Sequence, residues 1–89
     1  MRIQVGATSR KIRDGFEVRS ALLHLAGHGT DERLAVIALR EAVAAWCSGL
    51  TRAGCLEEVL KVKGLQYEAD GVGIEVSIEI DTANSIAAA

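Results

Sequence analysis

The fold of this chain is decided by residues 31–53, DERLAVIALREAVAAWCSGLTRA, which have the composition of one long and mostly apolar helix. Fourteen of these 23 residues are apolar, whereas a surface helix needs an apolar stripe only about 100° wide. Thr30 is the expected N-cap, and Asp31 and Glu32 in the first turn suit the positive end of the helix dipole. Gly54 is placed to end the helix. The stretch therefore predicts a helix that is covered on more than one side.

Helical spacing gives this predicted helix a main apolar face and an apolar flank. The residues of the main face are Leu34, Ala38, Ala42, Ala45, Trp46 and Leu50. Val36, Leu39 and Val43 widen that face, and Ile37 lies among polar neighbours. Because one small sheet does not hide so wide a surface, we expect the helix to contact a second copy in a homodimer, or another protein. The predicted interface residues are Val36, Ile37, Val43 and Trp46.

The last strand is the clearest of the predicted strands. Residues 74–81 alternate without exception between apolar and polar or acidic residues, which is the period of a half-buried strand. Residues 59–69 are expected to pair with them, because Asp70-Gly71 is a strong tight-turn signal. Apolar residues stay opposite apolar ones only if one residue is inserted, which predicts a β-bulge at Lys63-Gly64. We therefore expect a C-terminal β-hairpin at the centre of the sheet.

The first thirty residues give two overlapping patterns. Residues 2–6 alternate as a short strand, expected at an edge of the sheet. The pair Asp14-Gly15 suits either a hairpin turn or a helix that begins near residue 14. Four apolar residues at helical spacing favour a helix over residues 16–26, namely Val18, Ala21, Leu22 and Leu25. The glycines of residues 27–29 would then end this helix.

Together these elements predict a two-layer α+β domain with two helices packed on a small antiparallel sheet built around the C-terminal hairpin. The 89 residues are enough for one domain, and 49% of them are hydrophobic, which is enough for a core. We expect residues 1–81 to form this single compact domain. Residues 82–89 are expected to form a frayed C-terminal tail.

The net charge of −2 is unevenly distributed along the chain. Residues 1–30 carry five basic and two acidic side chains, whereas residues 31–89 carry five basic and ten acidic ones. An acidic chain argues against a general nucleic-acid binder, although residues 10–13 form a short basic segment that is able to contact phosphates. The two cysteines give no disulfide framework, and no apolar stretch is long and charge-free enough to span a membrane. We therefore expect a cytoplasmic protein.

Few residues suggest chemistry. His24 and His28 are four residues apart, the spacing of two metal ligands on one helical face, but no third ligand follows and we predict no metal site. Cys47 next to Trp46 suits a buried thiol better than a nucleophile. No spacing indicates a catalytic group or a cofactor site. The residues expected to line a ligand pocket between helix and sheet are His24, His28, Trp46 and Tyr67.

Two main functional hypotheses remain open at this point. The first is a non-enzymatic interaction or assembly module, which pairs through the wide helix face or an exposed strand edge. The second is a small-molecule-binding protein or small enzyme that uses the pocket described above. A weak nucleic-acid-associated regulator, binding through its basic N-terminal segment, is a third. No residue assigns a reaction, and the sequence favours the first hypothesis.

Overall fold

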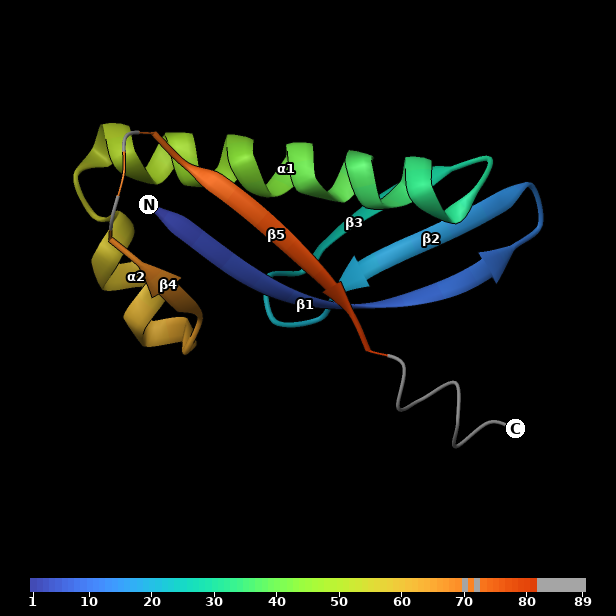
Figure 1. Ribbon diagram of the computed structural model, residues 1–89, viewed down its shortest axis with the longest axis horizontal. Helices are drawn as coiled ribbons and strands as arrows, with labels where there is room; N and C mark the ends of the chain where they lie inside the picture. The colour runs from blue at the N-terminus through green and yellow to red at the C-terminus, as the bar shows by residue number, and fades with distance from the viewer. Residues whose placement is uncertain (70, 72, 82–89) are drawn as a thin grey trace.

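The computed structural model describes residues 1–69, 71 and 73–81. In order along the chain, its elements are β1 (Arg2–Ile12), β2 (Gly15–Ser20), β3 (Leu25–Gly29), α1 (Glu32–Ala53), α2 (Leu56–Lys63), β4 (Gln66–Glu68) and β5 (Glu75–Ile80). The five strands form one sheet, and α1 lies across one of its faces (Figure 1). The predicted α+β class, with two helices and a small sheet, is confirmed.

Strand β1 is the centre of the sheet rather than an edge. Its first half pairs with β4 in antiparallel orientation and with β5 in parallel orientation, and its second half pairs with β2. Ile3, Val5 and Ala7 point into the core while their neighbours are exposed. The alternation that predicted a strand at residues 2–6 is therefore correct, but three strands use β1 as their partner, which places it inside the sheet.

The helix predicted over residues 16–26 is wrong, and the chain forms the alternative, a hairpin, although its turn is at residues 13 and 14 rather than at Asp14-Gly15. Residues 12 and 15 pair across a tight turn, and Gly15 has a φ of 153°. Strands β2 and β3 then form a second antiparallel pair. Val18 and Ser20 are fully buried and alternate with exposed Arg19. The strand period of two thus prevails over the helical spacing, because the pairing of β2 with β1 and β3 buries the side of β2 that carries Val18 and Ser20.

Glycines in β3 permit an unusually close contact with α1. A Cβ atom added at Gly27 would overlap the backbone nitrogen of Leu39 and the carbonyl oxygen of Ala35. A Cβ atom at Gly29 would lie 2.6 Å from the backbone nitrogen of Ala35. Only glycine leaves room for the two backbones to approach in this way. These glycines therefore do not end a helix; they let a strand pack directly against one.

The predicted C-terminal hairpin is also wrong. Strands β4 and β5 each pair with β1, which lies between them, and residues 56–63 form helix α2. Gly64 ends α2 with a φ of 74°, so there is no β-bulge at Lys63-Gly64. Leu56 and Leu60, four residues apart, are buried, and this helical spacing prevails over the strand pattern. The expected turn at Asp70 and the tail at residues 82–89 lie outside the described residues.

Helix α1 agrees with its prediction in extent, and differs in its cap and its buried face. Asp31 rather than Thr30 is the N-cap, and its Oδ1 accepts a hydrogen bond from the backbone nitrogen of Leu34 at 2.9 Å. Gly54 ends the helix in the left-handed conformation, as predicted. The buried stripe is narrow and consists of Ala35, Leu39, Val43 and Cys47. By length and hydropathy alone, α1 would also qualify as a membrane span; in this fold it packs on the sheet.

Candidate functional site

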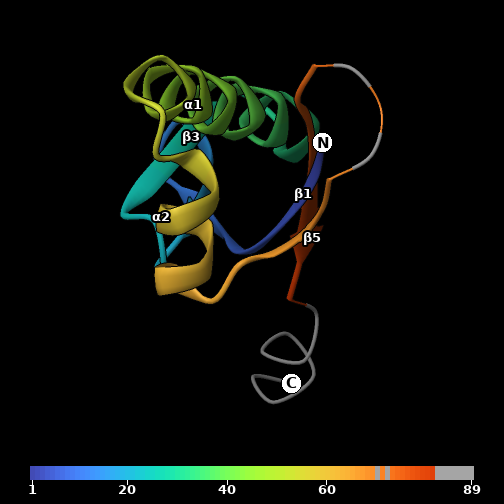
Figure 2. The same cartoon turned by 90° about the vertical axis from the view of Figure 1, so that its left-hand side faces the viewer.

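The face of the sheet that points away from α1 is polar and divided by charge. Residues of β1 at even positions point to this open face, and Arg2, Gln4, Thr8 and Arg10 are exposed there. The half of the open face formed by β2 and β3 carries basic side chains. The half formed by β4 and β5 carries Glu68, Glu75 and Glu79. Figure 2 shows β1 and β5 together at the side of the molecule, with α1 above them. The open face is therefore basic at one end and acidic at the other.

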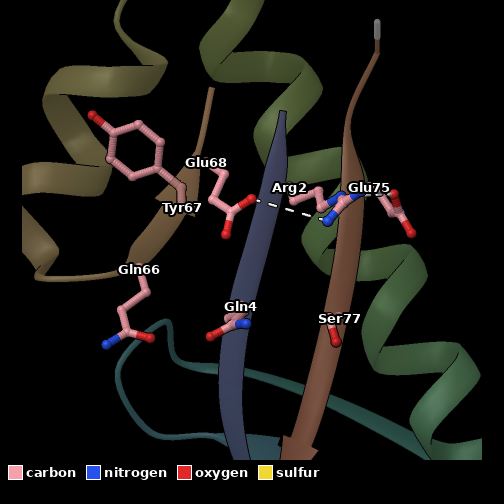
Figure 3. Close-up of a pocket in the computed structure, with 7 residues that line it drawn as sticks. All are labelled: Arg2, Gln4, Gln66, Tyr67, Glu68, Glu75 and Ser77. Atoms are coloured by element: carbon pink, nitrogen blue, oxygen red, sulfur yellow. Dashed lines mark ion pairs between the residues drawn. The ribbon is translucent and has the colours of Figure 1, made fainter. Parts of the chain in front are cut away.

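The acidic end holds a shallow depression of about 490 Å³ (Figure 3). Its lining residues are Arg2, Gln4, Gln66, Tyr67, Glu68, Glu75 and Ser77. Arg2 lies between the two carboxylates, with Nη1 3.9 Å from Oε2 of Glu68 and Nε 3.7 Å from Oε2 of Glu75. All three side chains are mostly exposed, and such surface ion pairs contribute only about 0–1 kcal/mol. The depression is polar and open, and it contains no activated group.

The basic end is organised around one carboxylate, Glu17 of β2. Its Oε1 accepts a hydrogen bond from Nη2 of Arg10 at 3.2 Å and lies 3.6 Å from Nε of Arg19. Its Oε2 lies 3.0 Å from Nε2 of His28. Partial burial acts to raise the pKa of Glu17, but the His28 hydrogen bond and the charges of Arg10 and Arg19 outweigh it, so the pKa lies below its ordinary value. Glu17 is therefore a stable anion within a basic cluster.

Within the described residues, the outer edge of strand β5 has no strand partner. On one side β5 bonds to β1: the backbone nitrogens of Glu75 and Asp81 donate to the carbonyl oxygens of Met1 and Ala7, each at 2.8 Å. Backbone groups alternate in direction along a strand, so those of Val76, Ile78 and Ile80 point to the opposite side. No other strand in the described part of the chain pairs there. An uncovered edge of this kind is a template for pairing with another chain.

A groove of about 500 Å³ separates this edge from α1. It is lined by Arg40 and Ala44 of α1 and by residues 74–77 of β5 and the segment before it. Its strand side has two apolar residues, Ile74 and Val76, together with Glu75 and Ser77. The groove lies beside the outer edge of β5, a position where an added strand could place side chains in it.

The four residues predicted to line a ligand pocket do not come together. His24 is exposed in the turn between β2 and β3, where its φ is 56°, and His28 lies on the open face. Trp46 is partly buried against the core. Tyr67 borders the depression at the acidic end, where Figure 3 shows its ring pointing away from Arg2. The predicted pocket between helix and sheet is therefore not formed by this set.

The residues predicted as a helix interface are divided in a similar way. Val43 is fully buried in the core and has no surface to offer a partner, because α1 faces the sheet with the stripe to which Val43 belongs. Val36 and Trp46 are half-buried against the same core. Ile37 remains 36% exposed, next to Leu34 at 41%. The outward apolar surface of α1 is thus smaller than its composition indicates.

The chemistry of the remaining candidates is limited. Burial raises the pKa of the Cys47 thiol, which makes the nucleophilic thiolate less available. Among the described residues, no three histidine, cysteine or acidic side chains are grouped as metal ligands. Comparisons with protein-family models, with curated proteins and with solved structures find no match. Function has to be argued from the surfaces described above.

Sequence reasoning missed both the Glu17 cluster and the free edge of β5. The hairpin alternative gave only part of the signal for the cluster, because a two-residue turn at Asp14-Gly15 would set Arg10 opposite Arg19. The observed turn at residues 13 and 14 shifts the register and pairs Arg10 with Glu17. His28 joins them only through the pairing of β2 with β3, which no local pattern shows. The free edge depends on β5 pairing with β1 across more than seventy residues of chain.

Proposed function

We propose that this chain is a non-enzymatic protein-interaction module that binds an extended segment of a partner protein along the free edge of β5. The observation that carries the proposal is the combination of a strand edge with no strand partner among the described residues and a groove beside it that includes Ala44, Ile74 and Val76. Main-chain hydrogen bonds to Val76, Ile78 and Ile80 would supply affinity. Side chains of the added strand that point toward α1 would enter the groove and supply specificity.

The charges beside β5 indicate the character of the partner strand. Glu75 and Glu79 lie on the open-face side of β5, with Ser77 between them. An added strand would place every second side chain next to this acidic row, where opposite charges stabilise cross-strand pairs by about 0.2–1 kcal/mol. Its remaining side chains would meet Ala44 and Val76 in the groove. The expected partner therefore alternates between basic and apolar residues.

A second copy of β5 fits this edge less well. In the antiparallel register centred on Ser77, Glu75 of one copy lies opposite Glu79 of the other. In the register centred on Ile78, Glu75 lies opposite Asp81. Like charges directly opposite each other destabilise a strand pair. The acidic row thus favours a different, basic strand over self-pairing.

A homodimer through α1 is the second candidate, because Leu34 and Ile37 remain exposed on its outer surface. Native mass spectrometry distinguishes this candidate from the first. A dimer that is lost in the variant Ile37→Ser would support pairing through the helix. A monomer that binds the peptide described next would support strand addition.

The test of strand addition uses the synthetic peptide KVKVKV and NMR spectra of the ¹⁵N-labelled protein. We expect saturable shifts at the amides of residues 74–80 and at Ala44. The variant Glu79→Lys should weaken binding about fivefold, because an attraction becomes a repulsion beside the added strand. Glu41→Lys, an equal charge change at an exposed position of α1, should bind as the wild type does.

Two further peptides serve as controls. KPKPKP keeps the charge but has proline, which has no backbone N–H and fits poorly in a strand, at every second position. EVEVEV keeps the alternation but reverses the charge. Both should bind much more weakly than KVKVKV. Equal binding of KPKPKP, or shifts confined to residues outside β5 and the groove, would contradict the proposal.

A further inference from the structure

We propose that the basic end of the open face, formed by Thr8, Arg10, Arg19 and His28 around Glu17, is a binding site for a dianionic phosphate monoester. This site lies on β1, β2 and β3, away from the edge of β5. It does not depend on the interaction proposed for β5, and either proposal can fail without the other.

Strand register brings these side chains into two adjacent rows. Arg10, Glu17 and His28 are paired residues on three neighbouring strands, and Thr8 and Arg19 form the next row of the same face. A depression of about 360 Å³ lies over them, lined by Thr8, Arg10, Glu17 and Arg19. Its size suits a phosphate group with a small substituent, and its lining side chains belong to two paired strands. The site is therefore built on sheet rather than on loops.

Glu17 is less exposed than the three basic side chains that it contacts, and it orients them. Its side chain is 12% exposed, whereas those of Arg10, Arg19 and His28 are 71%, 54% and 58% exposed. A guanidinium has five N–H donors, and the contacts with Glu17 involve only Nη2 of Arg10 and Nε of Arg19. Both guanidiniums thus keep further donors for a ligand. Glu17 is a positioning residue, which orients the donors that would bind the phosphate.

The charge of the site selects the kind of anion. Two arginines and one glutamate give the site a net positive charge of +1. Arginine is well suited to bind the oxygens of a phosphate monoester in pairs. A nucleic acid would continue along the sheet toward Glu68, Glu75 and Glu79, where the carboxylates would repel its phosphates. The face therefore favours a small monoester over a polyanion.

The experiment is an NMR titration of the ¹⁵N-labelled protein with phenyl phosphate at constant ionic strength. We expect saturable shifts at the amides of Thr8, Arg19 and His28 and at the arginine Nε–H groups, with a dissociation constant on the order of 1 mM. Arg19→Gln should weaken binding roughly tenfold through the loss of charge-assisted hydrogen bonds. Arg52→Gln, the same change in the last turn of α1, should leave binding unchanged. Inorganic phosphate, titrated in parallel, shows whether the ester substituent contributes.

Several outcomes would overturn the proposal. One is the absence of saturation at phenyl phosphate concentrations on the order of 50 mM. Another is wild-type affinity in both the Arg19→Gln and the Arg10→Gln variant, when their amide spectra show that they are folded. Tighter binding of a thymidine octanucleotide than of phenyl phosphate would assign the site to nucleic acid instead. The Glu79→Lys variant should bind phenyl phosphate normally, which separates this test from that of the β5 edge.

Discussion

Strands β3 and β5 are both edge strands of the sheet, and α1 packs against them in different ways. At β3 the helix backbone touches the strand backbone, because Gly27 and Gly29 have no side chains to separate them. At β5 the side chains of Ile74 and Val76 border a groove of about 500 Å³ between strand and helix. One side of the sheet is thus closed by direct contact with the helix, and the other is left accessible.

This difference separates the residues that maintain the fold from those available for binding. Ala35 and Leu39 of α1, which lie against Gly27, are fully buried. On the other side, Arg40 and Ala44 of the same helix line the groove. The residues of α1 that pack against β3 and those that line the groove at β5 are thus different residues of the same helix.

Substituting Gly27 should produce the largest effect on stability. In Gly27→Ala the new methyl group would overlap the backbone of α1, so the helix must move away from β3. We expect the free energy of unfolding to fall by about 3 kcal/mol, at the upper end of the cost of overpacking. Urea denaturation followed by circular dichroism measures the change.

Gly6→Ala is the matched control, because a Cβ atom at Gly6 has nothing within 4 Å. We expect its free energy of unfolding to change by less than about 1 kcal/mol, since the open face accepts a methyl group. Equal effects of the two substitutions would show that α1 does not rest on β3 as described. Should Gly27→Ala fail to fold while Gly6→Ala folds, the comparison is still confirmed.

The contrast between the two edges also explains what the sequence predicts and what it does not. Local signals were sufficient for α1, with its length and its terminal Gly54, and for the alternation of β5. They failed where a pairing distant in sequence decided the outcome. Val18 fits both the helical spacing of residues 16–26 and the alternation of a strand. Its pairing with β1 and β3 makes it part of a strand.

The candidate sites were less predictable than the fold for the same reason. His28 was singled out as the helical neighbour of His24, whereas the structure places it as the strand neighbour of Glu17. The composition of α1 overstated its outward apolar surface, because the five alanines of α1 that are not buried have small side chains and add little area. The sequence pattern drew attention to His28, and the register of the sheet places it beside Glu17.

Hydrogen exchange should reveal whether the edge of β5 is open in solution. Inward amides of Ser77 and Glu79 bond to β1, whereas those of Val76 and Ile78 point away from it. We expect the outward amides to exchange at least roughly tenfold faster, a difference of about 1.4 kcal/mol in protection. NMR-detected exchange at submillimolar protein concentration measures this alternation. Equal protection of all four amides would mean that the edge is covered, as in a dimer formed through β5.

The smallest effect concerns pH and distinguishes the Glu17 cluster from the rest of the surface. The pKa of Glu17 is lower in the folded protein than its ordinary value, so its carboxylate stabilises the fold above the ordinary glutamate pKa of about 4.3. That contribution is lost as the pH falls through the lower folded pKa. Between pH 6 and pH 3, stability should therefore fall less steeply in Glu17→Gln than in the wild type. Urea denaturation at a series of pH values measures the slope.

The control is Glu58→Gln, since Glu58 is an exposed residue in the first turn of α2. An equal change of slope in this variant would mean that Glu17 is not specifically stabilised by Arg10, Arg19 and His28.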